Sequence, residues 1–122
     1  MTETSKARLE FEHEGQVARV LLSAPKANIV DQAMMAALER AFEQLAARGD
    51  LKAIVLTADG PTFSFGASVQ EHLPEQIANT LSQLHALLRR IAEATAPTIA
   101  AVRGQCLGGG FELALACDLI LA

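Results

Sequence analysis

The first part of the chain shows two short apolar segments separated by a polar turn. Residues 8–12 and 16–22 flank the sequence His-Glu-Gly at 13–15, and this arrangement predicts a β-hairpin. In the second segment apolar side chains occupy both sets of alternating positions. Such a pattern is typical of a strand that is covered on both faces, so we expect the second strand to be largely buried.

Two amphipathic helices follow, each indicated by apolar residues that recur every three or four positions. Asp31 is a suitable N-cap for the first helix, and Gly49 is a suitable residue just beyond its C-terminus. The apolar face of this helix comprises Met35, Leu38, Phe42 and Leu45. Pro74 opens the second helical pattern, whose apolar face comprises Ile77, Leu81, Leu84, Leu88 and Ile91.

Three further β-rich segments, at residues 51–58, 98–102 and 119–121, alternate with helical segments. A glycine-rich turn at 104–110 and a short helix at 111–117 separate the last two strands. Strands that alternate with helices predict an α/β fold with parallel crossover connections. Because the chain stops within what should be a core strand, we expect it to be the N-terminal part of a longer protein.

The composition is that of a folded domain without a basic surface. Apolar residues make up 51% and charged residues 20%, which argues for one folded domain over residues 1–122. Ten basic against fourteen acidic residues give a net charge of −4, so we expect no nucleic-acid partner. Glu112 and Asp118 interrupt the most apolar window, 106–122, which therefore predicts a buried segment and no membrane span. With no apolar leader after Met1, we expect a cytoplasmic protein.

The first candidate for chemistry is the glycine-rich segment 104–112. Three consecutive glycines before a helix allow backbone N–H groups to approach a ligand, and the helix N-terminus adds partial positive charge. A phosphate-binding loop would end in Gly-Lys-Ser/Thr, and a dinucleotide-binding fingerprint would need glycine where Leu113 stands. The segment is therefore either a donor site for a developing oxyanion or a tight turn that allows close helix–strand packing.

Glu112 stands two residues after these glycines, and its neighbours along the chain are apolar. A carboxylate in such company is costly to bury unless it is paired, and it is a candidate for general acid/base work. The alternative is a glutamate in the first helical turn that only favours the helix dipole. The residues alone leave both interpretations open.

The second candidate is the loop at residues 63–68, which follows a strand end, where α/β sheets bind their ligands. Gly66 permits an unusual backbone conformation, so the N–H of Ala67 could point into a pocket. Two phenylalanines in so short a loop indicate an apolar wall, although an ordinary surface turn is the alternative. Both candidate loops follow strands, so we expect them to converge at one end of the sheet.

Together these segments resemble the signature of the crotonase (enoyl-CoA hydratase/isomerase) superfamily. The resemblance rests on residues 101–104, 108–114 and 117–120 for the glycine-rich motif, on 63–67 for the other oxyanion loop, and on Pro-Lys-Ala at 25–27 for the first coenzyme A contact. It implies a crotonase-like spiral of ββα units, of which this chain would be the N-terminal portion. It also implies an acyl-CoA thioester as substrate, no separate cofactor or metal, and a homotrimer or hexamer.

The resemblance also implies roles for individual residues. The backbone N–H groups of Ala67 and Gly109 would hold the thioester oxygen as it becomes an enolate, and Glu112 would activate a water molecule. The remaining contacts to substrate and coenzyme A would come from Lys26, Ala27, Phe65, Gly66, Ser68 and Gly108.

The chain departs from the family pattern at two places. Ser68 stands where many hydratases of the family carry Asp, and the second catalytic Glu of those hydratases would fall beyond Ala122. Residues 27–31, 63–72 and 104–107 resemble more closely those family members that hydrate a cyclic dienoyl-CoA in anaerobic benzoyl-CoA degradation. The alternatives are a short-chain enoyl-CoA hydratase or isomerase and a truncated, non-catalytic binding module. His72 is either a polar contact to a ring substrate or an exposed residue at a helix start.

Overall fold

The computed structural model describes residues 5–68 and 70–122. Its strands and helices follow one another along the chain as β1 (Ala7–Glu12), β2 (Val17–Leu22), α1 (Gln32–Ala46), β3 (Ala53–Ala58), the 3₁₀ helix η1 (Gln70–His72), α2 (Ile77–Ala92), β4 (Thr98–Ala101), α3 (Gly108–Leu115) and β5 (Leu119–Leu121).

The described strands form a single sheet in the order β1-β2-β3-β4-β5. β1 and β2 pair in antiparallel fashion and form the predicted hairpin. Every later pair is parallel, and each parallel step crosses over through a helix: α1 before β3, α2 before β4 and α3 before β5. The α/β architecture with parallel crossovers that the sequence predicts is confirmed.

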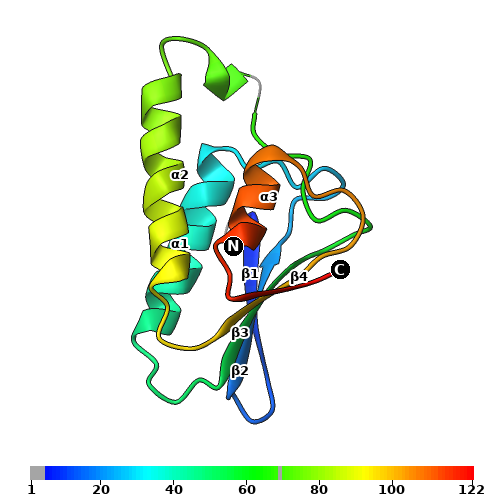
Figure 1. Ribbon diagram of the computed structural model, residues 1–122, viewed down its shortest axis with the longest axis vertical. Coiled ribbons are helices and arrows are strands. Elements are labelled where there is room, and N and C mark those ends of the chain that lie inside the picture. Colours follow the sequence, from blue (N-terminus) through cyan, green and yellow to red (C-terminus); the bar gives the residue numbers. More distant parts are fainter. Residues whose placement is uncertain (1–4, 69) are drawn as a thin grey trace.

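The helices pack on one face of the sheet, and the core lies between the two layers (Figure 1). Because side chains alternate along a strand, the residues of β2, β3 and β4 that face the helices are apolar or small. The fully buried side chains of this core include Val20, Leu22, Met34, Leu38, Leu56, Leu87 and Ile91. Burial of a Leu or Ile side chain stabilises a fold by about 1.5–3 kcal/mol, so this layer is what holds the sheet and helices together.

The start of α1 agrees with the sequence prediction. Asp31 has extended backbone angles, and its carboxylate accepts a hydrogen bond from the N–H of Met34 at 2.8 Å, as an N-cap does. The helix ends earlier than predicted, at Ala46 with Ala47 as C-cap, so Gly49 lies one position beyond the place predicted for it. Helix ends shift by one or two residues because the last turn is held by few hydrogen bonds.

The start of α2 lies three residues later than predicted, at Ile77 instead of Pro74. The chain first makes the 3₁₀ helix η1 and a turn, in which the N–H groups of Gln76 and Ile77 donate to the carbonyl of Leu73. This hydrogen-bonded turn stands where the sequence predicts the first turn of the helix. As a result, residues 70–76 form a separate segment between the loop after β3 and α2.

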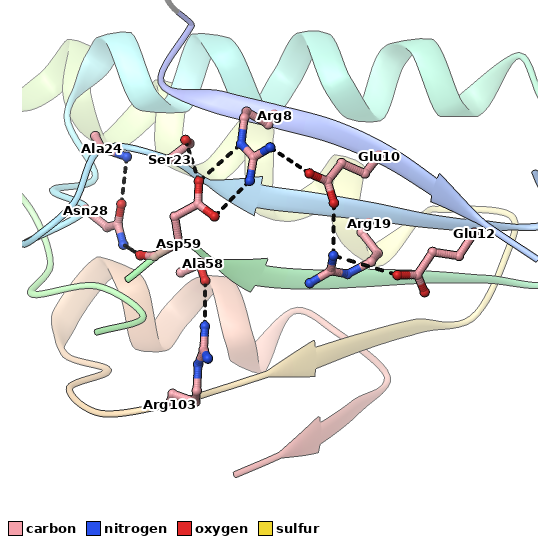
Figure 2. A network of polar contacts seen from close by, with 10 residues as sticks. All are labelled: Arg8, Glu10, Glu12, Arg19, Ser23, Ala24, Asn28, Ala58, Asp59 and Arg103. Carbon is pink, nitrogen blue, oxygen red and sulfur yellow. Dashed lines mark hydrogen bonds and ion pairs between the residues drawn. The ribbon is translucent and has the colours of Figure 1, made fainter. Parts of the chain in front are cut away.

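The other face of the hairpin is polar, and a network of ion pairs lies on it (Figure 2). The guanidinium of Arg8 donates to both carboxylate oxygens of Asp59, at 2.8 and 3.1 Å, and to Glu10 at 2.6 Å. Ser23 donates to Asp59 at 2.7 Å, and Arg19 donates to Glu10 at 2.9 Å. Hydrogen bonds from Arg8 and then Ser23 hold the pKa of the Asp59 carboxyl below its usual range. The network links β1 to the loop that follows β3.

β5 is the last strand of the sheet that the described residues form. It pairs only with β4, and Leu119 and Leu121 are 58% and 61% exposed. No described residue covers it on its outer side, which is why its apolar side chains are accessible. None of the helices in the described part of the chain combines the length and the apolar character that crossing a lipid bilayer would require.

Candidate active site

Three connecting segments meet at one end of the sheet, where the parallel strands β2, β3 and β4 reach their carboxyl ends. They are residues 23–31, 59–68 and 102–107. The ends of neighbouring parallel strands lie side by side, so the segments that leave them are brought together by the topology alone. The predicted convergence of the two candidate loops at this end is confirmed by the hydrogen bonds between them.

The loops after β3 and β4 pair along their backbones. The N–H of Ser64 donates to the carbonyl of Gln105 at 3.0 Å, and the N–H of Leu107 donates to the carbonyl of Ser64 at 3.0 Å. Ser64 and Cys106 thereby form a short parallel bridge outside the main sheet. The pairing fixes the start of α3 relative to the loop at 63–68.

The segment after β2 pairs with the other side of the same loop. The N–H of Phe65 donates to the carbonyl of Ala27 at 2.9 Å, and the N–H of Val30 donates to the carbonyl of Gly66 at 2.8 Å. Val30 and Ala67 form a second parallel bridge. The loop at 63–68 is therefore held from both sides, which gives its backbone N–H groups a defined direction.

Asn28 joins the segment after β2 to the loop after β3, a role that was not predicted from its sequence context. Its fully buried side chain accepts from the N–H of Ala24 at 2.8 Å and donates to the carbonyl of Asp59 at 3.1 Å (Figure 2). It also donates to the carbonyl of Thr62 at 2.9 Å. Its backbone has a φ of +46°, in the left-handed region. Asn tolerates that region better than most residues, and this was the only signal in the sequence that could have indicated the role.

α3 starts at Gly108, three residues earlier than predicted, so Gly109 and Gly110 belong to its first turn. At Gly110 this helix approaches the loop at 63–68 closely. A Cβ on Gly110 would lie 2.5 Å from the Cβ of Ser64, a distance that real side chains do not adopt. Ser64 is fully buried there, and its hydroxyl donates to the carbonyl of Asn28 at 2.8 Å and accepts from the N–H of Gly66 at 3.0 Å. The absence of a side chain at Gly110 is what lets the two segments touch.

The two predicted oxyanion donors lie next to each other. In the bridge to Val30 the carbonyl of Gly66 is the acceptor, and the N–H of Ala67 takes no part. Gly109 lies in the first turn of α3, where helical N–H groups have no partner within the helix. Within residues 5–68 and 70–122 neither N–H has a hydrogen-bond acceptor. A Cβ built on Gly109 would lie 4.0 Å from the amide nitrogen of Ala67, so the two residues are close neighbours at this point.

A cleft of about 570 Å³ lies in front of these donors. Glu112 lines it from the second turn of α3, and its lining comprises Phe65, Gly66, Ala67, Ser68, His72, Gly108, Gly109 and Glu112. The structure thus brings together the two predicted oxyanion donors, the candidate acid/base residue and four of the six predicted substrate contacts. The arrangement places a carboxylate beside two donors that can stabilise developing negative charge.

The apolar neighbours of Glu112 along the chain do not enclose it. The residue is exposed, although Leu113 and Ala114, which follow it, are buried. The reason is the helical period: α3 turns Gly110, Leu113 and Ala114 toward the core, and this turns Glu112 outward to the cleft. The described residues leave its carboxylate open to water.

Lys26 and Ala27 do not line the cleft. The carbonyl of Ala27 accepts a hydrogen bond from the N–H of Phe65, which does line the cleft. Lys26 is exposed. Phe65 itself is 46% exposed on the cleft wall. These positions are next to the cleft, where a ligand that extends beyond it would pass.

A smaller cavity of about 80 Å³ adjoins the cleft. Its walls come from α1, α2, α3 and η1, and they comprise Val30, Met35, Ala67, His72, Thr80, Leu81, Leu84, Gly109 and Glu112. Most of this lining is apolar. The site therefore has an open polar part and an apolar recess behind it.

The two cysteines, Cys106 and Cys117, are half-buried and form no disulfide. Burial raises the pKa of the Cys106 thiol and raises that of Cys117 to about 11. A thiol with a raised pKa is a weak nucleophile at neutral pH. Within residues 5–68 and 70–122 no group of three or more His, Cys, Asp or Glu side chains is arranged to hold a metal ion.

Comparison with known sequences shows one family. The family described as "Enoyl-CoA hydratase/isomerase" matches residues 12–122. A curated relative, the cyclohexa-1,5-dienecarbonyl-CoA hydratase of Thauera aromatica, is 46% identical over 119 residues, which are 98% of this chain and 46% of that protein. The chain therefore spans about half the length of the curated relative that it matches.

Comparison with solved structures shows the fold. An enoyl-CoA hydratase/isomerase from Xanthobacter autotrophicus Py2 is 33% identical with a TM-score of 0.86, over 97% of this chain and 46% of that one. DspI of Pseudomonas aeruginosa is 29% identical with a TM-score of 0.88, over 98% of this chain and 47% of that one. The fold that the motifs implied, the N-terminal portion of a ββα spiral, is confirmed.

Proposed function

Because this chain belongs to the enoyl-CoA hydratase/isomerase family, we propose that the complete protein adds water to the unsaturated acyl group of a coenzyme A thioester. The observation that carries the proposal is the pair of neighbouring N–H groups, on Ala67 and Gly109, at the wall of a cleft that also contains a carboxylate. A thioester oxygen held there gains negative charge when the bond to the neighbouring carbon becomes an enolate. Removal of one such donor typically costs about 10²–10³ in rate.

Glu112 is the proposed base for the water molecule. In the hydration an O–H bond of water breaks, its proton passes to Glu112, and the oxygen forms a bond to one carbon of the double bond. The electron pair of that double bond moves toward the thioester, and the carbon next to the thioester then takes up a proton. We expect the second proton to come from an acid/base group beyond Ala122. The exposure of Glu112 to the cleft supports this role, since a base must reach both water and substrate.

We propose a cyclic dienoyl thioester as the substrate. The proposal is supported by the 46% identity to a protein named cyclohexa-1,5-dienecarbonyl-CoA hydratase. It is also consistent with Ser68 at the cleft wall, where many short-chain hydratases of the family carry a carboxylate. Lys26 and Ala27, next to the cleft but outside it, are proposed to lie along the coenzyme A moiety.

The reaction can be tested with two thioesters and the longest polypeptide that the gene encodes. Cyclohexa-1,5-dienecarbonyl-CoA and crotonyl-CoA are supplied separately, and the mass of the product is followed. Faster addition of water to the cyclic diene supports the finer proposal. Faster hydration of crotonyl-CoA refutes the cyclic substrate and leaves a short-chain hydratase. A product of unchanged mass indicates isomerisation, and binding of acyl-CoA without turnover indicates a binding module.

The role of Glu112 can be tested in the same assay. Glu112→Gln keeps the size and polarity of the side chain but cannot accept the proton, so we expect kcat to fall by about 10²–10⁴ with little change in acyl-CoA affinity. Glu43→Gln is the matched control, because Glu43 is an exposed glutamate of α1 that lines neither the cleft nor the recess. Turnover of Glu112→Gln at the rate of the control would refute the role.

A further inference from the structure

His72 has no role in the reaction as proposed so far, yet it lies where the cleft and the apolar recess meet. The residues that line both of them are Ala67, His72, Gly109 and Glu112. Three of these four carry the proposed chemistry, two as oxyanion donors and one as the base. An acyl group with its thioester oxygen at Ala67 and Gly109 and its double bond beside Glu112 would occupy a space that His72 also lines.

The short segment that carries His72 is fastened to the helices around it. The carboxylate of Glu71 accepts a hydrogen bond from the N–H of Gln32, at the start of α1, at 2.8 Å. The carbonyl of Glu71 accepts from the hydroxyl of Thr80, on α2, at 3.0 Å, and this hydroxyl accepts from the side chain of Gln32 at 3.2 Å. Thr80 is buried. η1 is thus tied to α1 and to α2, and His72, although an exposed residue, is held at the wall of the cleft.

The surroundings of His72 on the recess side are apolar. Val30, Met35, Leu81 and Leu84 line the recess. The hydroxyl of Thr80, the third polar side chain there, already donates to Glu71 and accepts from Gln32. Among the described lining residues, the imidazole of His72 and the carboxylate of Glu112 are the polar side-chain groups without a partner in the protein. Each can therefore hydrogen-bond a ligand in the site.

We propose that His72 is a second side-chain contact for the oxygen that is added to the acyl group. Its imidazole hydrogen-bonds this oxygen while Glu112 accepts the proton of the water molecule. The inference rests on the proposed hydration, and it assigns a function to the segment between the first oxyanion loop and α2. Fixing the water from two sides lowers the entropic cost of placing it for attack, so the contact should act on kcat.

The test compares three variants of the longest polypeptide that the gene encodes. His72→Leu removes the hydrogen bond and keeps an apolar wall, whereas His72→Gln keeps an N–H donor at a similar reach. His85→Leu is the matched control, since His85 is an exposed histidine of α2 that lines neither cavity. Hydration rates are measured with the better of the two thioesters above. Affinity is measured with cyclohexanecarbonyl-CoA, a saturated thioester that cannot be hydrated.

We expect His72→Leu to lower kcat by about tenfold or more, the value of one hydrogen bond of ordinary strength, with affinity within about twofold of the wild type. His72→Gln should recover part of the loss, and His85→Leu should behave as the wild type. Unchanged kcat in His72→Leu would overturn the proposal. So would an equal loss in His72→Gln together with weakened binding, because that pattern indicates only a supporting wall.

A spectroscopic readout keeps this inference separate from the proposed reaction. In protein labelled with ¹⁵N-histidine, the ring signals of His72 are identified by their loss in His72→Gln. We expect these signals to shift when cyclohexanecarbonyl-CoA binds, and those of His85 to stay. A wild-type protein that hydrates neither thioester refutes the proposed function. His72 signals that do not move while cyclohexanecarbonyl-CoA is bound refute the contact itself.

Discussion

Gly110→Ala tests how closely α3 packs against the loop at 63–68. The added Cβ would lie 2.5 Å from the Cβ of Ser64 and 2.7 Å from its hydroxyl oxygen. The side chain of Ser64 cannot rotate out of the way, because it is fully buried and its hydroxyl is hydrogen-bonded to the carbonyl of Asn28 and the N–H of Gly66. The helix and the loop must therefore move apart.

The size of the effect follows from that separation. Ordinary van der Waals contact begins at 3.4 Å, so the two segments must separate by about 1 Å. Extra atoms in a well-packed site typically cost about 1–3 kcal/mol, and Ala regains up to about 1 kcal/mol over Gly as a helix former. We expect a net loss of about 1–2 kcal/mol in the free energy of unfolding. Turnover should fall as well, because the N–H of Gly109 moves away from Ala67.

The assay is urea unfolding of the longest polypeptide that the gene encodes, followed by far-UV circular dichroism. Gly49→Ala is the matched control, because a Cβ on Gly49 meets nothing within 4 Å. That variant should be neutral or more stable by up to about 1 kcal/mol. If Gly110→Ala unfolds within about 0.5 kcal/mol of Gly49→Ala, the close approach does not constrain the site and the reasoning is refuted.

A double variant identifies the cause of the loss. Ser64→Gly alone loses two hydrogen bonds and should be destabilised, but it removes the atoms that the new methyl group meets. Ser64→Gly with Gly110→Ala should therefore be more stable than the sum of the single effects predicts, by about 0.5–3 kcal/mol. Strict additivity would show that the loss in Gly110→Ala has another origin.

Two further substitutions test the contacts that Asn28 and Asp59 make at the carboxyl end of the sheet. Asn28→Asp should destabilise the fold more than Asn28→Ala, which itself should cost about 2–4 kcal/mol, because a carboxylate there would face the carbonyls of Asp59 and Thr62; equal urea midpoints for the two variants would contradict this. Asp59→Asn tests the ion pair with Arg8: the folded pKa of Asp59 is lowered, so its stabilisation is present above the unfolded pKa of about 3.9 and is lost as pH falls through the folded value. The difference in unfolding free energy between wild type and Asp59→Asn should therefore be largest near neutral pH and shrink below about pH 4, and a difference that does not change with pH would refute the assignment.

Local patterns were sufficient to predict most of the elements. The hairpin, the alternation of strands and helices and the Asp31 cap depend on periodicity and on short-range hydrogen bonds, which neighbouring residues control. The two candidate loops were located for a similar reason, since their glycines follow strand ends. Their meeting followed from topology, because parallel strands present the same end to one edge of the sheet.

The errors arose where a distant segment decides the local structure. Gly110 lies in the first turn of α3 and packs against Ser64, more than forty residues earlier, where there is no room for a side chain. The exposure of Glu112 depends on which side of a short helix meets the core, and the pattern along eight residues does not determine that.

The sequence by itself thus determined the order and type of the elements and the residues that could carry the chemistry. Only the tertiary structure decided how those residues face one another. Hydrogen bonds between residues far apart in the chain hold the walls of the site, and they involve Asn28, Ser64 and Glu71. The bond of Glu71 to Gln32 positions the segment that carries His72, which lines the cleft. The physical reason is that a side chain's identity is local, whereas the partner that orients it is chosen by the packing of the whole domain.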